Sequence, residues 1–198
     1  MENVFAYTPV AGSTDGLVGC RYNCRRGDPF EMFEPSTSQQ ETLEHFVRGA
    51  DRLEEAVLAL SESQLDVSGA PGEWTIRQLV HHVADDGDAW SMPFKKALAT
   101  PGARVRFEGF PGNEPWAAAL AFDRRPIGAS VALVKAHRRH MRDLAECFPD
   151  AWNRSVMIVD EQGRDVQAVS AGQIIRMLDE HLTEHLDVVD AIKRKHGL

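Results

Sequence analysis

The stretch MLDEHLTEHLDVV, residues 177–189, has the pattern of a buried helix in which two core positions carry histidine. The inward series has alternating steps of three and four residues, which place all of its side chains on one face of an α-helix. Its members are Ala171, Ile174, Leu178, His181, His185, Val188 and Ile192. Burying an imidazole without a hydrogen-bond partner costs about 1–3 kcal/mol. Each of the two histidine rings therefore requires a partner.

Two kinds of partner are compatible with this helix. Neighbouring carboxylates, such as those of Asp179 and Glu184, could accept hydrogen bonds from the rings. Alternatively, histidines at positions i and i+4 of a helix can bind one metal ion together. A single core histidine would favour the first interpretation, whereas two on the same face, with ring nitrogens that can meet at one point, favour a metal site. His181, Glu184 and His185 also match the H-x-x-E-H peptidase signature, but a small helical bundle offers no sheet or cleft for an extended peptide.

Composition narrows the class of protein. The chain has 198 residues, a formal net charge of −8 and a pI near 5.5, which argue for a single domain and against a nucleic-acid-binding protein. It contains no apolar run long enough to span a membrane, and its N-terminus lacks the pattern of a secretory signal. We therefore expect a cytoplasmic protein without a nucleic-acid or membrane partner. The C-x3-C pair of Cys20 and Cys24 lacks further cysteine ligands and is interpreted as a pair of reduced thiols in a loop.

Helix signals predict an all-α fold. Residues 1–37 show no sustained period and are expected to form an irregular N-terminal arm, followed by one helical domain over residues 38–198. We predict helices over about 38–62, 75–98, from Pro126 to Phe148, and 170–195, the last ending at Gly197. Three of them start with a Ser or Thr followed three residues later by Glu or Gln, a capping box: Ser38–Glu41, Thr75–Gln78 and Ser170–Gln173.

The connections suggest how these helices are joined. Residues 100–116, TPGARVRFEGFPGNEPW, are rich in Gly and Pro and are expected to form a long loop. Residues 156–159 and 165–169 flank EQGR and predict a short β-hairpin. The fold class predicted is a four-helix bundle with long crossover connections and a β-hairpin between the third and fourth helices.

The position of the other histidines around their helices predicts which way their side chains face. On the second helix His82 falls at the edge of the apolar sector and can face a site at the rim of the bundle, whereas His81 is expected to face water. On the third helix His137 lies near the apolar stripe and could line the same pocket. The surrounding run HRRHMR, residues 137–142, is expected to be a solvated face, the alternative being a site for the carboxylate of a thiol.

The block PGEWTIRQLVHHVADD, residues 71–86, followed about 100 residues later by HLTEH, resembles the DinB-like superfamily of metalloenzymes. The resemblance covers residues 38–195 and is strongest for the branch that contains the bacillithiol S-transferases. It implies a four-helix bundle in which His82, His181 and His185 bind a divalent metal ion, with water completing the shell. The N-terminal arm with Cys20 and Cys24 has no counterpart in this resemblance.

Three histidine ligands and an open position suit a catalytic metal ion, for which Zn²⁺ is expected and Ni²⁺ or Fe²⁺ are alternatives. The activity implied is an S-transferase that activates a low-molecular-weight thiol. The alternatives are a metal-dependent hydrolase and a metal-binding protein without catalysis. His137 and Glu184 are the residues expected to assist catalysis, Glu184 by orienting a ring or acting as a base. A homodimer formed through exposed helix faces is also compatible with a bundle of this kind.

Overall fold

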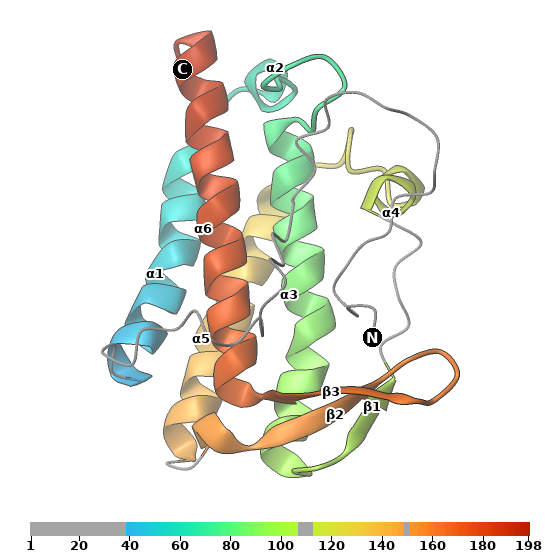
Figure 1. Ribbon diagram of the computed structural model, residues 1–198. Helices are drawn as coiled ribbons and strands as arrows, with labels where there is room; N and C mark the ends of the chain where they lie inside the picture. The colour runs from blue at the N-terminus through green and yellow to red at the C-terminus, as the bar shows by residue number, and fades with distance from the viewer. Residues whose placement is uncertain (1–38, 107–112, 149–150) are drawn as a thin grey trace.

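The computed structural model describes residues 39–106, 113–148 and 151–198 (Figure 1). The predicted arm, with Cys20, Cys24 and the capping residue Ser38, lies outside these residues. In chain order the elements are α1 (Gln39–Val57), α2 (Glu62–Leu65), α3 (Ile76–Ala99), β1 (Arg104–Arg106), α4 (Asn113–Ala119), α5 (Gly128–Cys147), a 3₁₀ turn η1 (Ala151–Asn153), β2 (Ser155–Val159), β3 (Asp165–Ser170) and α6 (Ala171–His196).

The four long helices form the predicted bundle, which confirms the fold class. They contact one another in the cyclic order α1, α6, α3, α5, so that α1 lies diagonally across from α3 (Figure 1). Helix α6 runs between α1 and α3, and its buried sector is correspondingly wide. Leu182, Leu186 and Val189 are buried there, whereas Val188, predicted to point inward, is 38% exposed. The predicted stripe was therefore wrong at Val188, because α6 packs against two helices and not one.

Local capping signals fix the ends of the helices that carry the histidines. Thr75 caps α3 and Ser170 caps α6, each with the reciprocal capping-box bonds to the glutamine three residues later. Helix α6 ends at Gly197, which adopts the left-handed conformation with φ 67°. The first helix is shorter than predicted. It ends at Val57, because Ser61 starts the separate short helix α2 with a capping box of its own.

A three-stranded sheet closes one end of the bundle. Strands β2 and β3 pair antiparallel, which confirms the predicted hairpin, and β1 adds to β2 in parallel. Strand β1 lies in the stretch predicted as a loop, and helix α4 begins in it. Three residues, of which only Val105 is buried, carry too short a pattern to signal a strand. The Gly and Pro residues around both elements favoured the prediction of a loop.

The apolar core consists of two clusters separated along the bundle axis. On α6 the cluster near the sheet extends to Leu178, and the other begins at Leu182. On α3 the corresponding residues are Trp90 and Ala84. The polar residues Asp86 and His181 therefore occupy a level between two apolar clusters. None of the helices in the described part of the chain is long and apolar enough to cross a membrane.

Candidate metal centre

Three imidazole rings from α3 and α6 meet beside this polar level. The Nε2 atom of His181 lies 3.0 Å from Nε2 of His82 and 2.9 Å from Nε2 of His185. The three ring centroids are 4.5–4.9 Å apart, and each pair of rings is nearly perpendicular. His181 and His185 are buried and His82 is partly exposed. The structure thus brings together the three histidines expected to be ligands, with their Nε2 atoms facing one point.

Asp86 lies behind His181, on the side away from the other two rings. Its Oδ2 atom is 3.0 Å from His181 Nδ1. With the Nδ1 proton donated to this carboxylate, His181 Nε2 carries a single in-plane lone pair. That lone pair cannot accept hydrogen bonds from His82 and His185 together. A cation among the three Nε2 atoms satisfies all of them, and a carboxylate behind a histidine ligand is a common arrangement at metal sites.

The spacing of the nitrogen atoms also fits a metal ion. Zinc–nitrogen bonds of about 2.0–2.1 Å in tetrahedral geometry put two ligand nitrogens about 3.3 Å apart. The observed separations of 2.9 and 3.0 Å come within a few tenths of an ångström of that value. The position of Asp86 at Nδ1 of His181 makes it a partner that orients a ligand and not a fourth ligand.

The electrostatics keep the donor set in the form that binds metal. Burial, reinforced by the neighbouring His181, lowers the pKa of His82 from 6.5 to about 3. Burial also lowers the pKa of His185 well below 6.5. For Asp86, burial alone would raise the pKa, but the charge and hydrogen bond of His181 outweigh it, so the pKa is lowered from 3.8. At neutral pH the site therefore offers neutral imidazoles at His82 and His185 beside an ionised carboxylate.

Two tryptophan–carboxylate hydrogen bonds attach α4 to α3 and to Trp74, just before the start of α3. Trp74 Nε1 donates to Glu114 Oε1 at 2.5 Å, and Trp116 Nε1 donates to Asp85 Oδ2 at 3.0 Å. The Trp74 ring lies edge-on to His82, with the centroids 5.0 Å apart. Trp74 therefore forms one wall of the histidine cluster. We did not predict this contact from the sequence, although Trp74 stands directly before the capping residue of α3.

The prediction for His81 was wrong, because this side chain is buried and only 1% exposed. Its Nδ1 lies 2.8 Å from Ser130 Oγ, and its Nε2 lies 3.1 Å from the carbonyl oxygen of Arg125. Burial lowers its pKa. The connection between α4 and α5 covers this face of α3, which periodicity within α3 alone could not reveal. His81 thus fastens that connection to the bundle.

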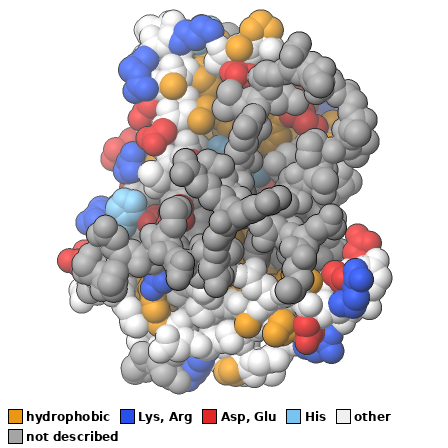
Figure 2. All heavy atoms as spheres, viewed as in Figure 1, with side chains coloured by type: hydrophobic (Ala, Val, Ile, Leu, Met, Phe, Trp, Pro, Cys, Tyr) orange, Lys and Arg blue, Asp and Glu red, His pale blue; other side chains and the backbone are white. Residues whose placement is uncertain are grey.

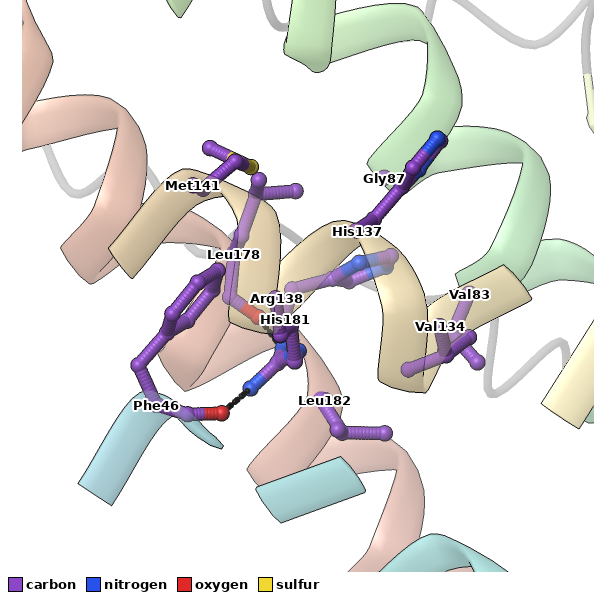
Figure 3. A pocket seen from close by; sticks show the side chains of 10 residues that line it. All are labelled: Phe46, Val83, Gly87, Val134, His137, Arg138, Met141, Leu178, His181 and Leu182. Atoms are coloured by element: carbon purple, nitrogen blue, oxygen red, sulfur yellow. Dashed lines mark hydrogen bonds between the residues drawn. The ribbon is translucent and has the colours of Figure 1, made fainter. Parts of the chain in front are cut away.

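His137 lies apart from the three histidines, at a small cavity beside His181. Both residues line this cavity of about 20 Å³, whose walls come from α1, α3, α5 and α6 (Figure 3). His137 Nε2 is 3.6 Å from Asp88 Oδ1, and burial lowers the pKa of His137. Glu184 is exposed on α6. The structure places neither His137 nor Glu184 in the cluster of three histidines.

The run of residues 137–142 is not a solvated face throughout, because Arg138 is buried and 6% exposed. Its guanidinium donates to the carbonyl oxygens of Phe46 and Leu178 and lies 3.4 Å from Asp179 Oδ1. Arg138 therefore links α5 to α1 and α6, and its donors are engaged within the bundle.

Sequence comparison identifies a family and relatives of this chain. The profile of the DinB superfamily matches residues 45–189. A protein of Bacillus pumilus (strain SAFR-032) named "Putative metal-dependent hydrolase" is 31% identical over 137 residues, which cover 68% of this chain and 74% of the relative. A protein of the same designation from Oceanobacillus iheyensis is 30% identical over 145 residues, covering 72% and 79% of the two chains.

Two solved structures share the fold. YfiT from Bacillus subtilis, described as a probable metal-dependent hydrolase with an unusual four-helix bundle topology, superposes with a TM-score of 0.69 at 20% identity and covers 83% of this chain and 93% of its own. A mycothiol-dependent maleylpyruvate isomerase superposes with a TM-score of 0.59 at 19% identity, over 79% of this chain and 62% of its own. At such identities the likeness establishes the fold alone.

Proposed function

The chain belongs to the DinB superfamily, and from this premise we propose that it is an enzyme whose divalent metal ion is held by His82, His181 and His185. The observation that carries the proposal is the meeting of three Nε2 atoms around His181, which Asp86 orients from behind. Imidazole ligands suit Zn²⁺, with Ni²⁺ or Fe²⁺ as alternatives. Three protein ligands leave a coordination position for a substrate.

The reaction proposed is the transfer of a low-molecular-weight thiol to an electrophile. When bound, the cation supplies the Lewis acidity that makes a thiol or a water molecule a nucleophile at neutral pH. The chain's own residues hold the ligand rings in place: Asp86 orients His181, and Trp74 lies against the edge of His82. Support for a thiol comes from the resemblance to the bacillithiol S-transferase branch and from the mycothiol dependence of the structurally similar isomerase.

Hydrolysis is the second candidate, and the names of the relatives favour it. The two reactions would share the same metal ion and differ in the nucleophile. His137 has the better placement of the two residues proposed to assist catalysis, because it lines the cavity beside His181, whereas Glu184 points to solvent. Its proposed role is to hold or transfer a proton near the metal centre.

Metal analysis of purified variants tests the site. His181→Ala and His185→Ala are expected to lose stoichiometric metal. The control His140→Ala, which removes an exposed histidine of α5, is expected to retain it. Full metal content in the His181 variant would refute the proposed site.

Conjugation of monochlorobimane with several thiols, in the presence of Zn²⁺ or Ni²⁺, tests the reaction. Metal-dependent and thiol-dependent conjugation that is lost in His181→Ala supports the transferase. Ester hydrolysis without any thiol dependence would support the hydrolase instead.

A further inference from the structure

Arg125 lies in the connection between α4 and α5, where hydrogen bonds to its backbone carbonyl oxygen hold it in place. Its carbonyl oxygen accepts hydrogen bonds from His81 Nε2 at 3.1 Å and from Arg77 Nη1 at 3.0 Å. Its guanidinium carbon lies 5.2 Å from the centroid of the Phe122 ring. These contacts fix the position of Arg125 without using the hydrogen-bond donors at Nε and Nη2.

The donors at Arg125 Nε and Nη2 are buried and have no hydrogen-bond partner among the described residues. The two buried arginines of the described residues differ: Arg77 pairs with Glu62 and Asp66, and Arg138 bonds two carbonyl oxygens and lies beside Asp179. Buried polar groups are nearly always paired, so an unpaired pair of donors on one guanidinium requires an explanation.

The geometry points to an anion. Nε and Nη2 are adjacent on one edge of the guanidinium, and together they match the two oxygens of a carboxylate or the oxygens of a phosphate. We propose that Arg125 is a binding site for the carboxylate of a small-molecule ligand. The site is distinct from the three histidines and does not require the metal ion.

Two aromatic rings lie between this arginine and the metal centre. Phe122 lies edge-on to Trp74, with centroids 6.5 Å apart, and Trp74 lies edge-on to His82 at 5.0 Å. A ligand with its carboxylate at Arg125 would therefore lie on the Trp74 side of the metal centre, two aromatic rings from His82. The identification of this ligand as an acidic thiol rests on the proposed function, whereas anion binding at Arg125 stands apart from it.

Thermal unfolding of the metal-free protein tests the anion site directly. Succinate and inorganic phosphate are added separately at constant ionic strength to the wild type, Arg125→Gln, Arg125→Lys and Arg124→Gln. Arg124 is the matched control, because it is the adjacent arginine and is exposed. We expect succinate to raise the Tm of the wild type and of Arg124→Gln but not that of Arg125→Gln. The Tm of Arg125→Lys is expected to rise only slightly, because lysine lacks the two adjacent donors of the guanidinium.

The same measurement separates a ligand site from a structural role. Without ligand, Arg125→Gln is expected to be about as stable as the wild type, because it removes two buried donors that have no partner. A lower Tm for Arg125→Gln together with an undiminished response to succinate would overturn the proposal. Protection by phosphate alone, still dependent on Arg125, would overturn the assignment of a carboxylate and indicate a phosphorylated ligand.

Turnover of the metal-loaded protein tests whether the anion belongs to the thiol. Mercaptosuccinate and 2-mercaptoethanol are compared in the bimane assay. Loss of hydrogen bonds to a charged group predicts that Arg125→Gln raises KM for mercaptosuccinate about 10- to 100-fold while leaving KM for 2-mercaptoethanol unchanged. An equal change for both thiols would refute the assignment to the thiol. If the wild type turns over neither thiol, the proposed transferase activity fails, and the Tm measurements still decide whether Arg125 binds anions.

Discussion

Asp86→Asn is expected to weaken zinc binding about 10- to 100-fold, as changes at residues that orient metal ligands commonly do. The carboxylate lies 3.0 Å from Nδ1 of His181, whose side chain is 3% exposed, while that of Asp86 is 18% exposed. A hydrogen bond to a charged group contributes about 1.5–3 kcal/mol. The partial exposure of Asp86 lets water replace some of this contribution. The predicted loss of affinity corresponds to about 1.4–2.7 kcal/mol, within the range for one such bond.

Asparagine is the informative replacement because it keeps the shape of the side chain. Its amide can turn either its oxygen or its NH₂ group toward His181 Nδ1. The NH₂ orientation favours the tautomer with the proton on Nε2, which cannot bind a metal ion. The variant therefore removes the charge and loosens control of the tautomer without leaving a cavity.

The assay is a zinc titration in competition with a chelating dye, which gives Kd for the wild type and each variant. Asp88→Asn is the matched control, since it removes the same charge from the same helix at an exposed position beside His137. A Kd for Asp86→Asn within twofold of the wild type would refute the orienting role. An equal loss in Asp88→Asn would show that general electrostatics, and not the contact with His181, determine the affinity.

Three further predictions concern the surroundings of the site. His81→Ala is expected to keep its metal but to lose about 1–3 kcal/mol of unfolding free energy in urea, because the hydroxyl of Ser130 and the carbonyl of Arg125 lose their partner; unchanged stability would contradict this. Since the pKa of His82 is about 3 in the folded protein and 6.5 otherwise, the unfolded chain binds more protons below pH 6.5. The metal-free protein should therefore lose stability as the pH falls from 6.5 toward 3, by up to about 1.4 kcal/mol per pH unit for this residue, with a smaller slope in His82→Gln; equal slopes in urea titrations would refute it. Trp74→Phe removes the donor to Glu114 but keeps a ring beside His82, so the Tm should fall while metal content stays at the wild-type level; loss of metal would show that the hydrogen bond to α4, and not the ring, positions His82.

The parts of the fold that the sequence predicted are those governed by local rules. Thr75 and Ser170 mark the starts of α3 and α6, because their capping boxes form within one helical turn. Gly197 ends α6 because glycine readily adopts a left-handed backbone. The same local geometry places His181 and His185 one turn apart on a buried face. The bundle, the hairpin and the pair of histidines were therefore all predictable without tertiary information.

The burial of His81 and the formation of strand β1 depended on contacts with other parts of the chain. His81 was predicted to be exposed because its own helix surrounds it with polar residues, yet the connection before α5 covers it. Strand β1 exists because β2 offers it a partner, and its three residues carry no signal of their own.

The sequence alone determined which helices form and which of their faces are apolar, since capping and periodicity act over a few residues. The resemblance to the DinB-like superfamily already implied that His82 shares a site with His181. Only the tertiary structure decided the contacts around that site: Asp86 behind His181, Trp74 against His82, and Arg125 with two donors unpaired. The physical reason is that hydrogen bonds and metal coordination act over about 3 Å, a distance that only packing sets between residues far apart in the chain.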